Sequence, residues 1–345
     1  MIDRELLRRL PKAELHCHLD GSVRPSTLLE LAREYGVVMP AATPEALRRY
    51  MHVTDARHLE DYLERFDITL SVLQTPDALE RVAYELAEDA ARDGVRYLEV
   101  RYAPTLNVRA GLSLGAAVEA SLAGVARGER DHGITARVII CALRTMPPGL
   151  AGEVARLAVA YRGRGVVGFD LAGGEVGNPA SRYADAFAIA RHGDLPCTCH
   201  AGEGAGAESV REALHVCCAN RIGHGTHLID DERLTEYCND LRVPIEVCLT
   251  SNVQTHAVTA YETHPLRAYF DRGLNVTLNT DNRLMSATTL TDEYEHAAIQ
   301  LGFTFDELAR IALNGFESAF LEWPERRMMV EAARREIEAL RGAAA

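Results

Sequence analysis

The stretch ELHCHLD at residues 14–20 alternates apolar and polar side chains, which is the period of a β-strand. A strand directs alternate side chains to opposite faces, so the polar residues of this stretch share one face. They are Glu14, His16, His18 and Asp20. A turn, Asp20-Gly21-Ser22, follows directly. The chain is therefore expected to begin with a strand that presents two imidazoles near its carboxyl end.

Seven more short apolar or β-branched runs follow, and amphipathic helical segments separate them. Alternation of strands and helices predicts a parallel sheet. Eight repeats over about 300 residues predict an α/β fold of the (β/α)₈ TIM-barrel type, in one domain spanning residues 1–345. A doubly wound open sheet is the alternative. The expected strands are residues 14–19, 96–102, 136–142, 166–171, 196–200, 221–224, 244–249 and 275–280.

The connection between the first two strands is longer than the others and contains two or three helical pieces. Its stretch LEDYLERF places four apolar side chains on one helical face. This face is either an ordinary core stripe or the inner side of a lid over the barrel mouth, formed by helices at about 41–76. The four residues are Leu59, Tyr62, Leu63 and Phe66.

Composition excludes several classes of function. The chain has 37 basic and 50 acidic residues, a formal net charge of −13, which argues against a general nucleic-acid or anionic-membrane surface. Lys12 is the only lysine, so a Walker A lysine, a mid-chain Schiff base and a carbamylated lysine bridging two metals are excluded. No apolar run suits a signal peptide or a membrane span. The eight cysteines lack a framework spacing, and we expect reduced thiols in the cytoplasm.

Polar residues recur where other predicted strands end. One strand ends in His200, which Ala-Gly-Glu203 follows; the next ends in His224, and the last ends near Asp281. A fourth ends in the run from Asp170 to Glu175. The carboxyl ends of barrel strands carry the active site, so these groups should converge.

Three histidines and one carboxylate suit zinc, with a position left for water. The residues themselves therefore predict a mononuclear metal hydrolase, with His224 and Glu203 left for proton transfer. These residues alone do not indicate which substrate the enzyme would use. The predicted ligands are His16, His18, His200 and Asp281.

Two further observations have ordinary structural interpretations. Glu99 and Arg101 share one face of the second strand and are expected to form a charge layer inside the barrel. His256 and His264 are expected in loops or at the surface.

Six motifs, in the same order and with comparable spacing, resemble the adenosine deaminase family of zinc aminohydrolases within the amidohydrolase superfamily. The family fold is a (β/α)₈ barrel, in agreement with the strand count. The motifs are PKAELHCHLDGS (11–22), VGFDLAGGE (167–175), HAGEG (200–204), RIGHGTH (221–227), EVCLTSNVQT (246–255) and LNTDNRLMS (278–286).

The resemblance implies the zinc ligands already predicted, with one ion per subunit, and a role for other residues. Glu203 would protonate purine N1, and His224 would orient and deprotonate the zinc-bound water, which Asp281 also holds. Gly173 would contact purine N3, and Asp20 the ribose 5′-hydroxyl. The apolar face at 59–66 falls where the family keeps a gate, which favours the lid.

Three residues depart from the common family pattern, on the ribose and N7 side of the pocket. Asn282 replaces an aspartate that contacts purine N7, Gly174 replaces another aspartate, and Thr145 replaces a histidine. An amide can still donate to N7, so we include Asn282 among the substrate-binding residues.

The expected reaction is hydrolytic deamination of adenosine or 2′-deoxyadenosine to the inosine product plus ammonia. An aminodeoxyfutalosine deaminase of the menaquinone pathway or an adenine deaminase would use the same zinc site. An inactive homologue that acts as a binding module is a remote alternative. The expected partner is a small purine nucleoside rather than nucleic acid or membrane, and the enzyme would be a monomer or homo-oligomer.

Overall fold

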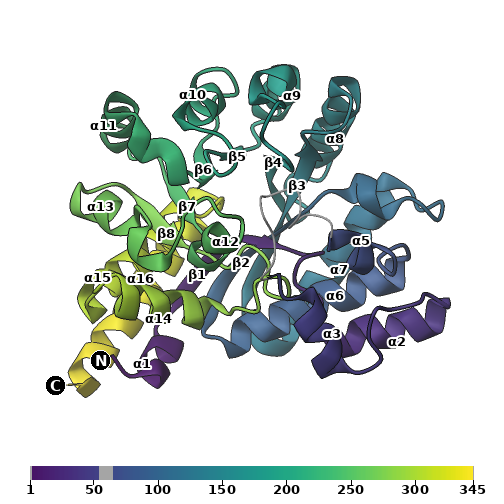
Figure 1. Cartoon of the computed structure of the whole chain (residues 1–345), viewed down its shortest axis with the longest axis horizontal. Coiled ribbons are helices and arrows are strands. Elements are labelled where there is room, and N and C mark those ends of the chain that lie inside the picture. The colour runs from purple at the N-terminus through teal and green to yellow at the C-terminus, as the bar shows by residue number, and fades with distance from the viewer. Residues whose placement is uncertain (1, 54–64, 345) are drawn as a thin grey trace.

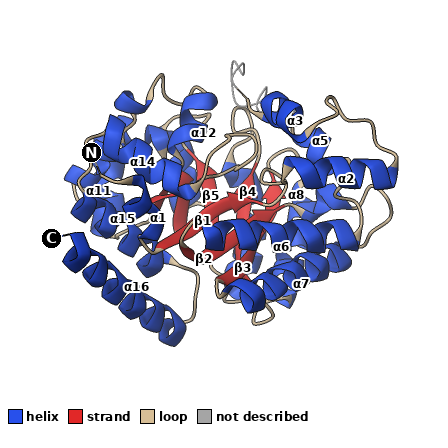
Figure 2. Cartoon of the chain, turned by 90° about the horizontal axis from the view of Figure 1, so that it is seen from below, coloured by secondary structure: helices blue, strands red, loops and turns tan. Residues whose placement is uncertain are grey.

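The computed structural model describes residues 2–53 and 65–344, and its strands form the centre of the molecule (Figures 1 and 2). Within this part of the chain the strands pair in parallel as two four-stranded sheets, in the orders β1-β2-β3-β4 and β5-β6-β7-β8. They are β1 (Lys12–His18), β2 (Val95–Tyr102), β3 (Thr135–Leu143), β4 (Val166–Ala172), β5 (Thr198–Ala201), β6 (Arg221–His224), β7 (Ile245–Val247) and β8 (Val276–Leu278).

Two parallel bridges join the sheets and close the ring. Phe169 pairs with Cys197 between β4 and β5, and Cys17 pairs with Asp281 beyond the end of β8. At the second junction the His18 amide donates to the Asp281 carbonyl at 2.7 Å. The predicted (β/α)₈ barrel is therefore confirmed, and the open sheet is excluded.

Helices surround the barrel, as Figure 2 shows in blue around the red strands. None of the helices in residues 2–53 and 65–344 is both long and apolar enough to cross a membrane. The α-helices are α1 (Arg4–Arg9), α2 (Pro25–Tyr35), α3 (Pro44–Met51), α5 (Phe66–Leu70), α6 (Pro76–Arg92), α7 (Leu114–His132), α8 (Pro148–Ala160), α9 (Ala184–His192), α10 (Ala207–His215), α11 (Glu232–Asp240), α12 (Leu249–Gln254), α13 (Leu266–Asp271), α14 (Leu290–Gln300), α15 (Phe305–Ser318) and α16 (Trp323–Ala344). Short 3₁₀ helices are η1 (Pro104–Asn107), η2 (Ala180–Tyr183), η3 (Thr226–Asp230) and η4 (Tyr261–Thr263).

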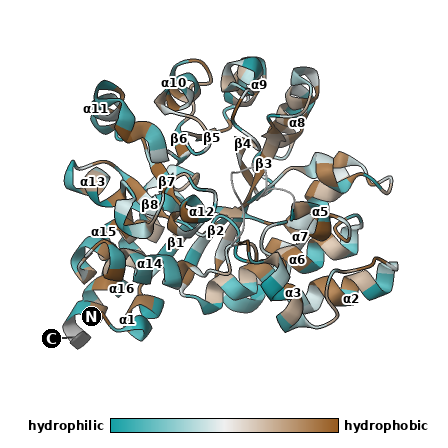
Figure 3. Ribbon diagram, in the orientation of Figure 1, coloured by the Kyte–Doolittle hydropathy of each residue, from teal (hydrophilic) through white to brown (hydrophobic). Residues whose placement is uncertain are grey.

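Helix α6 shows how the sequence sets a helix of the outer ring. Thr75 caps its first turn by accepting from the Ala78 amide, and Pro76 supplies a fixed φ at the first helical position. Its buried face includes Leu79, Val82 and Leu86. Figure 3 shows the hydrophobic residues concentrated on the strands and on the helix faces toward them. Burial of such faces is the main stabilising contribution to the barrel.

The last two strands are shorter than the sequence predicts. The expected strand at 244–249 ends at Val247, because helix α12 already begins at Leu249. The expected strand at 275–280 ends at Leu278, and the chain then turns so that Asp281 adopts a φ of 59°. Periodicity could not show these turns, because the residues in them are still buried.

The lid stays a prediction. Leu59, Tyr62 and Leu63 lie outside the described residues. The described parts of the long β1–β2 connection include α2, α3 and α5, as expected of an insertion with extra helices. Phe66 begins α5, and its side chain lines a cavity at the barrel mouth.

A buried ion network fills the middle of the barrel. Arg221 on β6 donates to Glu99 on β2, and through Nε to Glu246 on β7 at 2.6 Å. Arg101 on β2 donates to Glu246 at 2.9 Å and to Asp170 on β4 at 3.1 Å. The predicted charge layer is confirmed, and its pairs run between strands rather than along β2.

We expect Arg221→Ala to lower the free energy of unfolding by about 3–5 kcal/mol, because it leaves Glu99 and Glu246 buried without their shared cation. Urea unfolding of the variant measures this loss. The control is Arg341→Ala, which removes an exposed pair with Asp306 and should cost less than about 1 kcal/mol. Equal, small losses in both variants would contradict the account of the layer.

Candidate functional site

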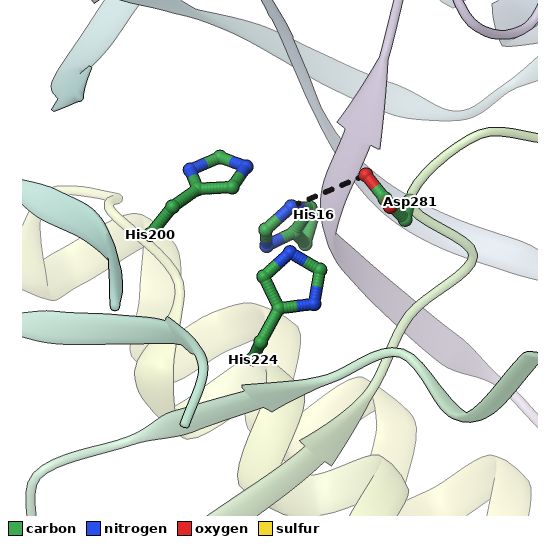
Figure 4. Close-up of side chains that lie close together, drawn as sticks. All are labelled: His16, His200, His224 and Asp281. Atoms are coloured by element: carbon green, nitrogen blue, oxygen red, sulfur yellow. Dashed lines mark ion pairs between the residues drawn. The ribbon is translucent and has the colours of Figure 1, made fainter. Parts of the chain in front are cut away.

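Four strand ends bring imidazoles and a carboxylate together inside the barrel mouth. His16 and His18 lie on β1, His200 on β5, His224 at the end of β6, and Asp281 just after β8. Single ligand atoms of His16, His200, His224 and Asp281 all lie within 4.8 Å of one another. Figure 4 shows these four side chains converging, with the His16–Asp281 pair dashed. The convergence predicted from the sequence is thus present, and the arrangement is a candidate metal centre.

The distances fit a metal ion held by the three predicted histidines and Asp281. Asp281 Oδ1 lies 3.4 Å from His16 Nε2 and 3.3 Å from His18 Nε2. His18 Nε2 lies 3.1 Å from His200 Nε2. A tetrahedron whose centre is about 2.0 Å from each ligand atom has edges of about 3.3 Å. Three of the six distances among the four ligand atoms therefore match the spacing around one shared ion.

Buried carboxylates orient two of the imidazoles. His16 Nδ1 is 2.9 Å from Glu246 Oε2, and His200 Nδ1 is 3.1 Å from Asp170 Oδ2. Each carboxylate accepts the Nδ1 proton, so Nε2 keeps a free lone pair, as metal-binding histidines require. His16 Nε2 is buried and has no hydrogen-bond partner. A metal ion would satisfy this atom.

His224 is held in a different way. The Leu266 amide donates to His264 Nδ1 at 3.0 Å, so the proton of His264 is on Nε2, which lies 3.1 Å from Asn252 Oδ1. This orients the Asn252 amide so that Nδ2 donates to His224 Nδ1 at 3.0 Å. The hydrogen bonds therefore assign the proton of neutral His224 to Nε2. A protonated nitrogen is a hydrogen-bond donor and not a ligand, so this tautomer favours His18 over His224 as the fourth ligand.

Burial and neighbouring charges set the protonation of the cluster. Burial lowers the pKa of His18, His200 and His224, so these imidazoles are neutral near pH 7. Burial alone would raise the pKa of Asp281, but His16 and the other imidazoles hold it well below its usual range. Burial and Arg101 lower the pKa of His16, yet Asp281 and Glu246 raise it overall. A raised pKa means that His16 holds a second proton more firmly, and a cation binding at Nε2 would displace that proton.

The backbone makes room for the cluster at particular positions. A Cβ on Gly223 would lie 3.0 Å from His16 Cε1 and 3.2 Å from His200 Cα, so any other residue in β6 would crowd the His16 imidazole and the backbone of His200. His224 and Asp281 have φ values of 62° and 59°, which are rare for residues other than glycine. Such backbone strain is concentrated at functional sites.

A cavity of about 230 Å³ opens beside the cluster. His18, His200, His224 and Asp281 form its floor. Glu203 faces it, with Oε1 accepting from Thr255 Oγ1 at 3.1 Å and Oε2 3.5 Å from His224 Nε2. The walls are largely apolar, with Phe66, Leu70, Leu106 and Leu143 among them. Apolar walls around a few polar groups are typical of small-molecule sites.

Three other predicted binding residues, Asp20, Gly173 and Asn282, also line this cavity. Asp20 is buried, its Oδ1 has no hydrogen-bond partner, and burial raises the pKa of its carboxyl to about 7. Gly173 has a φ of 92°, a conformation that favours glycine. Asn282 is buried with Oδ1 unpartnered. Gly174 and Thr145, the two other departures from the family pattern, lie in the same wall.

Sequence reasoning missed the residues that orient the cluster. His264 lies in a loop, one of the two positions expected, but the sequence did not indicate that it is buried, with only 3% of it exposed. It is buried because it bonds Asn252 inside the barrel mouth. Ser251, which donates to Asp281 Oδ2 at 2.7 Å, and Asn252 were quoted only as part of a motif. The signal available was their place after β7, at the same end as the ligands.

Comparisons with known proteins show the family of this chain. The family model "Adenosine deaminase" matches residues 11–335. The chain belongs to the adenosine deaminase family. An adenosine deaminase of Mycolicibacterium gilvum is 43% identical over 345 residues, covering 95% of this chain and 95% of the relative. A probable adenosine deaminase of Dictyostelium discoideum is 42% identical over 321 residues, and the match covers 93% of this chain but only 42% of that relative.

Solved structures of similar proteins have the same fold. An adenine deaminase from Arthrobacter aurescens aligns with a TM-score of 0.89 at 30% identity, covering 95% of this chain and 99% of that one. A zinc-bound amidohydrolase from Burkholderia ambifaria gives 0.90 at 28% identity, covering 99% and 95%. The N6-methyl-AMP deaminase of Arabidopsis thaliana gives 0.84 at 28% identity, covering 98% of each chain.

The ligand set is tested by replacing the two histidines that compete for the fourth position. We expect His18→Ala to bind little metal, because it removes a ligand atom, whereas His224→Ala should keep about one metal ion per chain. Elemental analysis of the purified variants measures the metal, and circular dichroism checks that both are folded. Metal loss from His224→Ala with retention by His18→Ala would reverse the assignment.

Proposed function

We propose that this protein is a zinc-dependent adenosine deaminase, which converts adenosine or 2′-deoxyadenosine to inosine or 2′-deoxyinosine plus ammonia. The observation that carries the proposal is the convergence of His16, His200 and Asp281, with His18 Nε2 3.1 Å from His200 Nε2 and Glu203 facing the same cavity. Membership of the adenosine deaminase family supports the same reaction.

Zinc suits this donor set of three imidazole nitrogens and one carboxylate oxygen. When bound, zinc lowers the pKa of a water molecule to about 7 and so supplies hydroxide at neutral pH. The outer carboxylates of Glu246 and Asp170 hold His16 and His200 in the tautomer that exposes Nε2. Ser251 occupies Oδ2 of Asp281 and leaves Oδ1 toward the imidazoles.

Glu203 and Asp281 are proposed to transfer the protons of the reaction, and His224 to orient the attacking water. Glu203 protonates purine N1, which makes C6 electrophilic, and Thr255 holds its other oxygen. His224 presents an Nε2–H toward the cavity because Asn252 donates to its Nδ1. This tautomer suits the orienting part of the role proposed for His224, since an N–H donates to the attacking oxygen. Asp281, the carboxylate nearest the imidazoles, then accepts the proton from the attacking water and passes it to the amino group, which leaves as ammonia. The remaining hydroxyl proton returns to Glu203.

The proposed binding mode uses the rest of the cavity. Gly173 contacts purine N3 through its backbone, and Asn282 contacts N7. Asp20 meets the ribose 5′-hydroxyl, and a neutral hydroxyl is a suitable partner for its buried, unpartnered oxygen. The apolar side chains around Leu106 and Leu143 contact the rest of the nucleoside.

Two relatives of this reaction are the competing candidates. An adenine deaminase has the same barrel, as the Arthrobacter aurescens structure shows, but a free base would leave Asp20 without a partner. An aminodeoxyfutalosine deaminase would need space for a benzoate at the 5′ end. Asp20, buried beside the cavity, favours a substrate with an unmodified 5′-hydroxyl.

We expect adenosine to give the highest kcat/KM in a panel that also contains adenine and a 5′-substituted adenosine. An absorbance assay of the zinc-loaded enzyme measures the three values. Negligible turnover of adenosine beside fast turnover of the 5′-substituted compound would overturn this choice of substrate.

We expect Glu203→Gln to lower kcat by about 10²–10⁴-fold while the zinc content stays unchanged, because the side chain donates a proton and binds no metal. Elemental analysis and the same assay measure both quantities. Loss of zinc from this variant, or a kcat near that of the unmodified enzyme, would contradict the proton-donor role.

A further inference from the structure

The side chain of Glu175, just beyond β4, lies under the loop that carries Glu203. Its Oε1 accepts from the Gly202 amide at 2.6 Å, and its Oε2 accepts from the Glu203 amide at 3.0 Å. The next two amides, of Gly204 and Ala205, donate to Oε2 at 2.7 and 2.9 Å. Four successive backbone N–H groups therefore point at one carboxylate.

This carboxylate is buried and is bound by neutral donors. Glu175 is 5% exposed, and Ser209 at the start of α10 donates to its Oε1 through Oγ. Four backbone amides and one hydroxyl thus surround an anion position, which a side chain of the same protein occupies. A single group in this position fixes the direction of four peptide planes at once.

The position of the loop bears directly on the proposed chemistry. Glu203 is the second of the four residues bound, and its side chain reaches the cavity beside His224. Arg144 also links the segments that follow β4 and β5. Its guanidinium donates to the His200 carbonyl at 2.7 Å and to the Asn178 carbonyl. Glu175 also follows Gly173 by two residues, so the β4 and β5 loops that flank the cavity are joined through it.

We propose that Glu175 is a positioning residue that acts through Glu203, by holding the loop 202–205 so that the Glu203 carboxyl meets purine N1. The inference rests on the proposed deamination. Glutamine cannot replace glutamate here, because its amide would direct N–H donors at backbone N–H donors. Errors of about 1 Å in the placement of a catalytic group can cost about 100-fold in rate.

The test is a double-mutant cycle on the zinc-loaded enzyme with adenosine. We expect Glu175→Gln to lower kcat about 100-fold with KM and zinc content little changed. In the Glu203→Gln background the same substitution should lower kcat less than about threefold, because the group it positions is already absent. Equal fold losses in both backgrounds, or an unchanged kcat in Glu175→Gln, would overturn the inference.

Glu212→Gln is the matched control. Glu212 on α10 also accepts from a loop amide and a serine hydroxyl, those of Ser181 at 3.2 Å each, but it does not line the cavity. Its substitution should leave kcat within about twofold. A loss as large as that of Glu175→Gln would show a general structural effect and overturn the positioning role.

Ser209→Ala covers the case in which Glu175→Gln does not fold. It removes one of the five donors, and we expect faster amide hydrogen exchange in residues 202–205 together with a three- to tenfold lower kcat. The exchange measurement needs no substrate, so it also separates this inference from the proposed function. Unchanged exchange together with unchanged kcat would overturn the inference. Faster exchange with no turnover of adenosine by the parent enzyme would overturn only the proposed substrate.

Discussion

The carboxylate of Glu246 is the point at which the core of the barrel and its metal centre meet. Its Oε1 accepts from Arg221 and Thr198, and its Oε2 accepts from Arg101 and lies 2.9 Å from His16 Nδ1. Burial alone would raise its pKa, but the two arginines hold it well below the usual range. The charge layer therefore keeps this carboxylate ionised, and the ionised carboxylate fixes the first imidazole.

At other strand ends too, an outer residue sets the orientation or the tautomer of a group that faces the cavity. Asp170 binds both Arg101 and His200, so the ion network reaches a second imidazole. Asn252 and His264 set the tautomer of His224, and Glu175 holds the loop of Glu203. The reacting groups lie on short strands and turns, but polar contacts within a rigid barrel keep them in position. Loss of such outer contacts typically costs about 10–100-fold in metal affinity or activity.

The sequence alone predicted the barrel, because eight apolar runs with helical spacers admit few arrangements. It also predicted the convergence of His16, His200, His224 and Asp281, since barrel strands end at one face. It could not predict the left-handed backbone of His224 and Asp281 or the early ends of β7 and β8, because these follow from tertiary contacts. The partners of Glu99 and Arg101 were missed for the same reason: strand order places Arg221 and Glu246 opposite them only in the closed ring.

The central claim is that the buried ion network organises the metal centre through Glu246. The direct measurement is the zinc affinity of Glu246→Gln, determined by competition with a chromogenic chelator, with circular dichroism to confirm folding. The amide cannot hold His16 Nδ1–H as the carboxylate does, so the account predicts an affinity about 10–100-fold weaker than that of the unmodified protein. A folded variant that binds zinc with unchanged affinity would contradict it.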